Sequence, residues 1–232
     1  MRESVSEPRP RVTPQLYVPF DWPVGKLTLL PPAAMHLQVD IASISQERQS
    51  RRRFAPMSVA QLGTLLWLTC RTHSSRASEY GFDQHFRPHP SAGAIHPIHV
   101  ICQRAPSQPW ERYDPGRHVL VTIPGSEELA QNARMQAEKF FTTGEAVLLA
   151  LVAEGGKTAA KYESEQSLVW RDAGVVLGYL SLVSEALGLS FCPLGATGHS
   201  HLAPVAPAGI LQGAGLAVLG ARGGEVQANN DN

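Results

Sequence analysis

An arginine-rich stretch stands out in a chain whose charges balance. Residues 48–53 read RQSRRR and hold four arginines, although the whole chain has 20 Lys and Arg against 20 Asp and Glu. Arg48, Ser50 and Arg52 alternate, so their side chains point the same way in an extended segment. Two planar guanidiniums and a hydroxyl are suitable donors to a phosphate group. A solvated basic surface is the alternative interpretation.

A second stretch is marked by small residues. Pro90, Ser91, Ala92 and Gly93 directly precede a segment with the alternation of a β-strand. Small side chains allow backbone N–H groups to approach a flat ligand. A tight loop without a ligand would have the same composition.

These two stretches, in this order, resemble the nitroreductase-like flavoprotein superfamily. More narrowly, the chain resembles the SagB-type dehydrogenases, which include the azoline oxidases. The family pattern Arg-x-Ser-x-Arg-x-Phe is matched by residues 48–54, and its Pro-Ser-Ala-Gly loop by residues 90–93. The later segments WERYDPGRHVL, KYESEQSLVWRDAG and SEALGLSFCPLGA also fit, so the resemblance extends over residues 27–222.

The resemblance implies an α+β, nitroreductase-like fold with a central mixed or antiparallel sheet flanked by helices. It also implies FMN bound at the interface of a homodimer. The residues expected to bind FMN are Arg48, Gln49, Ser50 and Arg52 at the phosphate and ribityl chain, Pro90, Ser91, Ala92 and Gly93 along the isoalloxazine ring, Leu194 and Gly195 near its N5 atom, and Arg222 as a second phosphate contact.

Lys161 and Tyr162 are the expected catalytic residues. In azoline oxidases a Lys-Tyr pair at this place, just before a long helix, is catalytic. Oxidation of an azoline removes a hydride, which flavin accepts, and a proton, which a deprotonated Tyr or Lys can accept. The family often has Gly after the pair, whereas this chain has Glu163. An exposed lysine beside a packing tyrosine is the alternative.

Two histidines depart from the family pattern. The loop after residues 90–94 usually runs Leu-Tyr-Pro-Leu-Glu, and here His96 and His99 replace the Tyr and the Glu. His-x-x-His can bind zinc or iron, as can the pair His199 and His201. Pro97 interrupts the first pair, and no acidic or cysteine ligand is close in sequence to the second. We therefore expect hydrogen-bonded or solvated histidines and no metal site.

Helices and strands that could position these residues follow from periodicity and capping. Ser58 and Gln61 have the spacing of a capping box, and Ser126 is expected to cap another helix. The predicted helices are 58–70, 126–141 and 167–188, the predicted strands are 98–103, 118–123, 146–154 and 215–221, Tyr113–Gly116 form a turn, and 71–90 is a loop. Helices and strands do not alternate regularly, which favours an α+β fold over a doubly wound sheet.

Composition predicts a soluble globular protein. Hydrophobic residues make up 43% of the 232 residues and charged residues 17%. The three cysteines are far apart in sequence, so we expect free, buried thiols in a reducing compartment. No signal peptide or apolar span is found; we expect a cytoplasmic protein with no nucleic-acid or membrane partner. The predicted organisation is an N-terminal arm at 1–26, a single domain at 27–224 and a C-terminal tail at 225–232.

Together these features predict an FMN-dependent oxidoreductase that transfers a hydride to or from flavin N5. The substrate is a C–H bond beside nitrogen in an azoline-like small molecule or peptide, or the enzyme is an NAD(P)H-dependent nitro or quinone reductase. A non-catalytic, ligand-binding relative of the fold and a histidine-ligated metal protein are the remaining alternatives.

Overall fold

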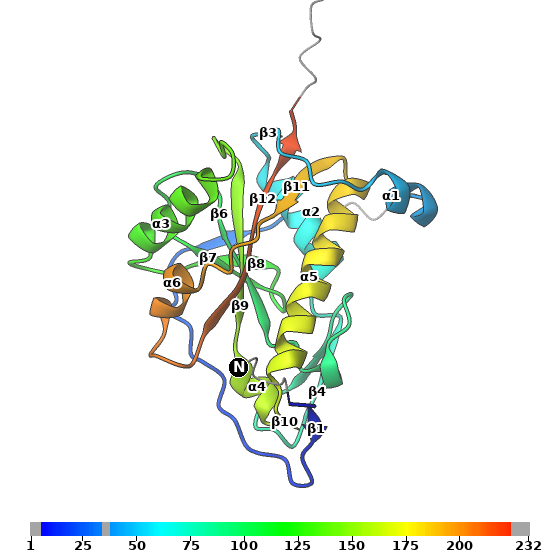
Figure 1. Ribbon diagram of the computed structural model, residues 1–232, viewed down its shortest axis with the longest axis vertical. Coiled ribbons are helices and arrows are strands. Elements are labelled where there is room, and N and C mark those ends of the chain that lie inside the picture. Colours follow the sequence, from blue (N-terminus) through cyan, green and yellow to red (C-terminus); the bar gives the residue numbers. More distant parts are fainter. Residues whose placement is uncertain (1–5, 34–37, 224–232) are drawn as a thin grey trace, which may run out of the picture.

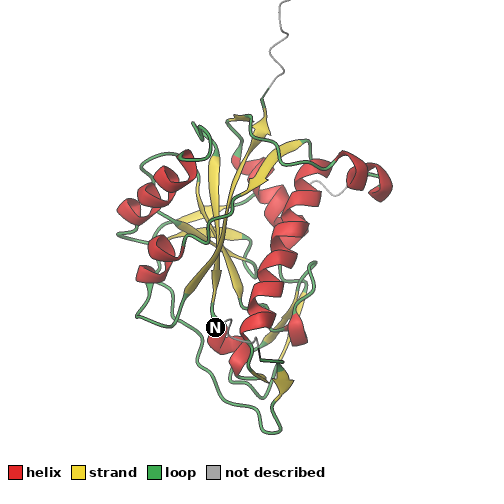
Figure 2. Cartoon of the chain, viewed as in Figure 1, coloured by secondary structure: helices red, strands yellow, loops and turns green. Residues whose placement is uncertain are grey.

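An antiparallel sheet of eight strands forms the centre of the protein, and helices flank it (Figures 1 and 2). The computed structural model describes residues 6–33 and 38–223. The strand order is β11-β12-β9-β6-β7-β8-β2, and β3 pairs with the end of β12. The strands are β2 (Leu27–Leu29), β3 (Phe54–Ala55), β6 (Ile98–Gln103), β7 (Glu111–Asp114), β8 (Val119–Thr122), β9 (Val147–Ala153), β11 (Leu189–Pro193) and β12 (Gln212–Arg222). The predicted α+β fold is confirmed.

Six α-helices and two short 3-10 turns surround the sheet in the described residues. They are α1 (Ile41–Glu47), α2 (Val59–Cys70), η1 (Ala92–Ala94), α3 (Glu127–Glu138), α4 (Gly155–Ala159), α5 (Gln166–Ala186), α6 (His199–Leu202) and η2 (Ala203–Val205). Helices α2 and α5 cover one face of the sheet, and α3 and α6 cover the other (Figure 1).

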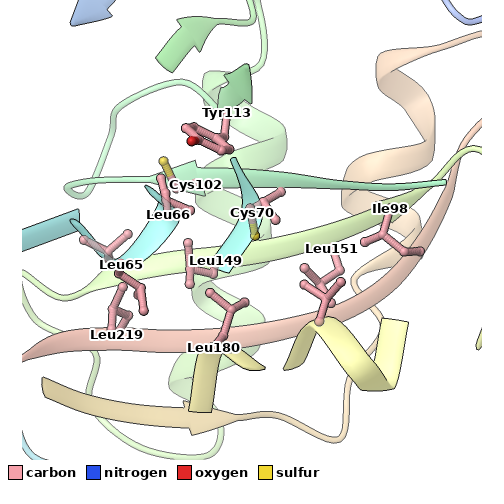
Figure 3. Close-up of a cluster of buried hydrophobic side chains, with 14 of the residues drawn as sticks. Leu65, Leu66, Cys70, Ile98, Cys102, Tyr113, Leu149, Leu151, Leu180 and Leu219 are labelled. Atoms are coloured by element: carbon pink, nitrogen blue, oxygen red, sulfur yellow. The ribbon is translucent and has the colours of Figure 1, made fainter. Parts of the chain in front are cut away.

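The central strand β9 supplies side chains to both hydrophobic layers. Its odd-numbered residues, such as Leu149 and Leu151, pack with α2 and α5, whereas Leu148 and Ala150 pack with α3 and α6. Figure 3 shows the first layer, where Leu65 and Leu180 meet β9 from the two helices. Burial of every residue of β9 explains why its sequence is an uninterrupted apolar run.

The elements with strong periodicity were predicted correctly. Ser58 and Gln61 form both hydrogen bonds of the capping box at the start of α2. Helix α5 agrees with the predicted helix within two residues at each end, and Gly188, just beyond it, has a φ of 67°. A residue in this left-handed conformation commonly follows the end of a helix, and glycine adopts the conformation without strain.

Other predictions were wrong in detail. Ser126 precedes α3, but its hydroxyl donates to the carbonyl of Ile123 and accepts from the N–H of Trp110, so it does not cap the helix. Residues 71–90 are not a simple loop, because β4 (Ser74–Arg76) and β5 (Gln84–Phe86) pair as an antiparallel ladder. Tyr113 and Asp114 belong to β7 and not to the turn that follows it.

The N-terminal arm packs against the domain. Within it, β1 (Arg9–Pro10) pairs with β10 (Tyr162–Glu163). Residues 1–5 of the predicted arm and the whole tail 225–232 lie outside the described residues. The three cysteines are free and buried, as predicted. Among the described residues no helix has the length and hydropathy that a membrane span requires.

Candidate functional site

The arginine-rich stretch, which connects α1 to β3, borders a pocket. Its volume is about 660 Å³, and its walls come from Gln49, Ser50, Arg51, Arg52, Arg53, Ser190, Arg222 and Gly223. Four residues predicted to bind phosphate therefore line one pocket, including Arg222 from the distant strand β12. The fifth, Arg48, follows α1 directly, donates its N–H to the carbonyl of Ile44 and is not among the lining residues.

A buried carboxylate organises this pocket. Glu185, near the end of α5, accepts hydrogen bonds of 2.8 and 3.2 Å from Arg51 and also pairs with Arg222. Burial alone would raise the pKa of Glu185, but the two guanidiniums hold it below its usual value. Arg51 alternates with the residues predicted to bind phosphate, and its guanidinium is ion-paired with Glu185 at the pocket. Arg52 lies beside the thiol of Cys192.

The small-residue loop is held by a second buried carboxylate of α5. The Ser91 hydroxyl donates to Asp172 at 2.6 Å, and the N–H of Ala92 donates to the other oxygen of Asp172 at 3.1 Å. Burial raises the pKa of Asp172, and these two hydrogen bonds oppose the rise. Gly93 has a φ of 61°, and Ala94 and His96 also have left-handed φ values. The loop thus has a tightly defined backbone.

Lys161 and Tyr162 lie directly against this loop. The Lys161 amine is 3.4 Å from the carbonyl oxygen of Gly93. A Cβ atom on Gly93 would lie 2.7 Å from Lys161 Nζ and 2.8 Å from Tyr162 Oη. Two motifs that are distant in sequence, the predicted ring-binding loop and the predicted catalytic pair, are therefore in contact, and only glycine fits between them.

Leu194 and Gly195 follow strand β11, whose second residue, Ser190, lines the arginine pocket. At about 3.3 Å per residue they lie on the order of 13 Å beyond Ser190. The N–H of Leu194 donates to the carbonyl of Leu216 at 2.8 Å, and Gly195 is exposed with open space above it. This pair could therefore approach a ligand that extends from the pocket.

The arginine pocket and the small-residue loop lie far apart within one chain. The pocket is anchored at Glu185 and the loop at Asp172, thirteen residues apart on α5. At 1.5 Å per residue this separation is about 20 Å along the helix. The structure brings Lys161 and Tyr162 to the loop, and Arg222 to the arginines, but it does not join the two groups in a single chain.

The two histidines that depart from the family pattern are built into the fold. His99 Nε2 lies 2.8 Å from a carboxylate oxygen of Glu154, and burial lowers the pKa of His99 to about 4. His96 is buried with its ring 4.8 Å from that of His89, and burial lowers its pKa to about 2. Both imidazoles are therefore neutral at pH 7. The described residues include no group of three His, Cys, Asp or Glu that could hold a metal ion.

The sequence matches the Nitroreductase family over residues 45–209. The chain belongs to the nitroreductase family. No curated protein sequence matches it. Among solved structures, a putative nitroreductase from Ralstonia eutropha JMP134 has 19% identity and a TM-score of 0.68, covering 94% of this chain and 100% of its own.

Two further structures share the nitroreductase fold. The Escherichia coli microcin synthetase McbBCD complex, with truncated pro-MccB17 bound, has 16% identity and a TM-score of 0.58 over 84% of this chain and 77% of its own. A putative nitroreductase from Desulfovibrio desulfuricans, in complex with FMN, has 16% identity and a TM-score of 0.50 over 81% of this chain and 88% of its own. At these identities the likeness establishes the fold alone.

Three buried carboxylates of this nitroreductase-family chain were not anticipated as site residues: Glu154, Asp172 and Glu185. Asp172 and Glu185 lie in a helix that is otherwise largely apolar, and acidic side chains are rarely buried without a partner. The position of Asp172 and Glu185 within an apolar sequence pattern could have indicated that both carboxylates are buried and paired. Their partners could not be inferred, because these come from distant parts of the sequence.

Proposed function

We propose that this protein is an FMN-dependent oxidoreductase that removes a hydride from a C–H bond beside nitrogen, in an azoline-like small molecule or peptide. The observation that carries the proposal is the contact of Gly93 with Lys161 and Tyr162. This contact supports the proposal, because Lys161 and Tyr162 are the proposed proton acceptors and the loop is proposed to lie along the flavin ring. The fold shared with a microcin synthetase solved with pro-MccB17 bound supports a peptide as one form of the substrate.

The chemistry of the arginine pocket fits the phosphate of FMN. Ser50, Arg52 and Arg222 would donate to the phosphate oxygens, and guanidinium groups are strong paired donors to phosphate. Glu185 would hold Arg51 and Arg222 in place from behind. Residues 90–93 would border the ring, with Leu194 and Gly195 near N5. Bound FMN would supply the hydride acceptor.

Either Lys161 or Tyr162, in its deprotonated form, would accept the single proton that leaves the substrate together with the hydride. The Lys161 amine lies 3.4 Å from the carbonyl oxygen of Gly93 and 5.6 Å from the centre of the Tyr80 ring. A side chain held in this way has few conformations to lose when substrate binds, which favours proton transfer. Asp172 keeps the loop in place through Ser91 and Ala92.

We also propose that the active form is a homodimer. One FMN could contact both groups of residues if the arginine pocket comes from one copy and the small-residue loop from a second. On α5, Gly174 and Gly178 are exposed with nothing within 4 Å of an added Cβ, and the neighbouring Trp170 is 38% exposed. Such a face suits close packing of a second helix. Light scattering of the FMN-loaded protein tests the mass directly.

The test of the proposed function compares Lys161→Met, Tyr162→Phe and the wild-type protein. Each is loaded with FMN and mixed anaerobically with an azoline substrate, and flavin bleaching is followed. Loss of a general base lowers such rates by about 10²- to 10⁴-fold, so we expect at least one variant to fall in this range while still binding FMN. Wild-type rates in both variants, or no bleaching of the wild type by any azoline, would contradict the proposal.

The second candidate function is an NAD(P)H-dependent nitro or quinone reductase, which the match to the Nitroreductase family favours. Rapid flavin reduction by NADPH, unaffected by Lys161→Met and Tyr162→Phe, would select this function instead.

A further inference from the structure

Residues 9–22 of the N-terminal arm are bound along the segment that carries Lys161 and Tyr162. The N–H of Arg11 donates to the carbonyl of Lys161 at 2.9 Å, and its Nε donates to the carbonyl of Ala159 at 2.7 Å. The N–H of Gln15 donates to the carbonyl of Ala160 at 2.9 Å. With the pairing of β1 and β10, the arm contacts every residue from 159 to 163.

Tyr17 of the arm packs against Gly81 and Gly156, and we call the space that these two glycines leave the Gly156–Gly81 socket. A Cβ on Gly156 would overlap the Tyr17 ring, with the ring atoms Cζ and Cδ2 at 2.6 and 2.8 Å. A Cβ on Gly81 would lie 2.8 Å from the carbonyl oxygen of Tyr17. The N–H of Tyr17 donates to the carbonyl of Tyr80, the residue whose ring flanks the Lys161 amine. Only glycine at both positions allows the arm to lie this close.

Glu154 and His99 hold the end of the arm. The N–H of Phe20 donates to one oxygen of Glu154 at 2.6 Å, and His99 bonds to the other oxygen. The Trp22 ring lies 5.0 Å from the His99 ring. Glu154 immediately precedes α4, so the same carboxylate joins the arm to the helix that leads to Lys161.

Residues 155–163, which include Lys161 and Tyr162, depend on contacts with the arm because their own helix and strand are short. Helix α4 has five residues and β10 has two. A single helical turn is unstable without tertiary contacts, and a two-residue strand exists only by pairing with another. The pairing partner and several of the backbone hydrogen bonds of 159–163 come from the arm.

We propose that the arm is a positioning strap: its binding to the Gly156–Gly81 socket holds Lys161 and Tyr162 against Gly93. This role deepens the proposed function, because it assigns the geometry of the catalytic pair to a segment outside the family motifs. The simpler alternative is an arm that adds stability without affecting the pair.

The test uses Gly156→Ala, whose added methyl group would displace the Tyr17 ring. Gly155→Ala is the matched control, because it changes the neighbouring residue of the same helix and its Cβ meets nothing within 4 Å. Alanine favours helices over glycine, so neither change weakens α4 itself. Arm seating is measured by hydrogen exchange at the amides of Arg11 and Gln15.

The position of Lys161 is measured by acylation of the native protein and mass spectrometry. We expect Gly156→Ala to raise both amide exchange and Lys161 acylation by at least tenfold, and to lower kcat for the azoline substrate with little change in KM. Gly155→Ala should behave as wild type. Unchanged acylation and kcat in Gly156→Ala, despite faster exchange in the arm, would overturn the positioning role.

A second pair of variants covers the case that Gly156→Ala does not fold. Tyr17→Ala removes the ring from the socket and should raise Lys161 acylation, whereas Tyr17→Phe keeps the ring and should restore the wild-type value. Equal acylation in both would contradict the proposal. Exchange and acylation require neither flavin nor substrate. If the protein fails to bind FMN, the proposed function is refuted. Amide exchange in the arm and Lys161 acylation would still test whether the arm positions Lys161.

Discussion

The close fit of Gly93 against Lys161 and Tyr162 allows a sharp test with Gly93→Ala. An alanine at a left-handed φ costs roughly 1–2 kcal/mol of folding free energy. The new Cβ would also lie 2.7 Å from Lys161 Nζ and 2.8 Å from Tyr162 Oη. Since non-bonded atoms prefer about 3.5 Å, the Lys161 and Tyr162 side-chain atoms must each move by roughly 0.8 Å. A displacement of about 1 Å at a reacting group can lower the rate by about 10²-fold.

Gly125→Ala is the matched control, because Gly125 has a φ of 73° but nothing within 4 Å of its Cβ. We expect both variants to lose a similar few degrees of Tm, since about 1 kcal/mol corresponds to 2–4 °C in a protein of this size. Only Gly93→Ala should reduce the azoline-dependent rate of flavin bleaching, by about 10- to 100-fold at saturating FMN. Equal rates in the two variants would refute the assignment of Lys161 and Tyr162 to the reacting centre.

Three further outcomes follow from buried polar groups. Burial lowers the pKa of His89 to about 4, below the unfolded value of about 6.5, so its stabilising contribution is present above pH 6.5 and is lost as the pH falls towards 4. Lowering the pH to 4 should therefore reduce the free energy of unfolding, measured with urea, by about 3 kcal/mol on account of His89. A His89→Gln variant with the same pH dependence as wild type would contradict this. Asp172→Ala releases Ser91 from a charge-assisted hydrogen bond of about 1.5 kcal/mol; FMN affinity measured by fluorescence titration should fall about tenfold, and an unchanged Kd would count against the loop as a flavin contact. Arg134 is 1% exposed and donates hydrogen bonds to the side chain and the carbonyl of Gln103. Arg134→Met should lower the free energy of unfolding by about 3 kcal/mol or more. A loss under about 1 kcal/mol would contradict this and would show that water replaces these hydrogen bonds.

The elements that were predicted correctly are those whose burial produces a regular spacing or an unbroken run of apolar residues. Helix α2 has a capping box and an apolar face, and β9 is apolar throughout because both of its faces are covered. Strands β4 and β5 were missed for the opposite reason. They have three residues each, β4 is exposed along its whole length, and their pairing depends on backbone hydrogen bonds that leave no periodic signal.

The ligand contacts of the site residues stay predictions, and only part of the arrangement of these residues in the fold was anticipated. The position of Arg222 in the same pocket as Ser50 and Arg52 agrees with the resemblance. Nothing local indicated that Glu185 would pair with Arg51 and Arg222. Residues 1–26 were predicted as an N-terminal arm from their proline and polar residues, but the contacts of residues 9–22 with the domain were not predicted. Its attachment uses main-chain groups, two glycines and side chains from distant parts of the chain such as Glu154, and these form no recognisable pattern in sequence.

The measurement that tests the central claim most directly is the flavin content of the purified protein and of Arg52→Met. After heat denaturation the wild type should release about one FMN per chain, the stoichiometry of one phosphate pocket per copy. Arg52→Met should fold normally and release much less FMN, because the substitution removes one of the proposed phosphate donors. A folded wild-type protein that is colourless and takes up no added FMN would contradict the account.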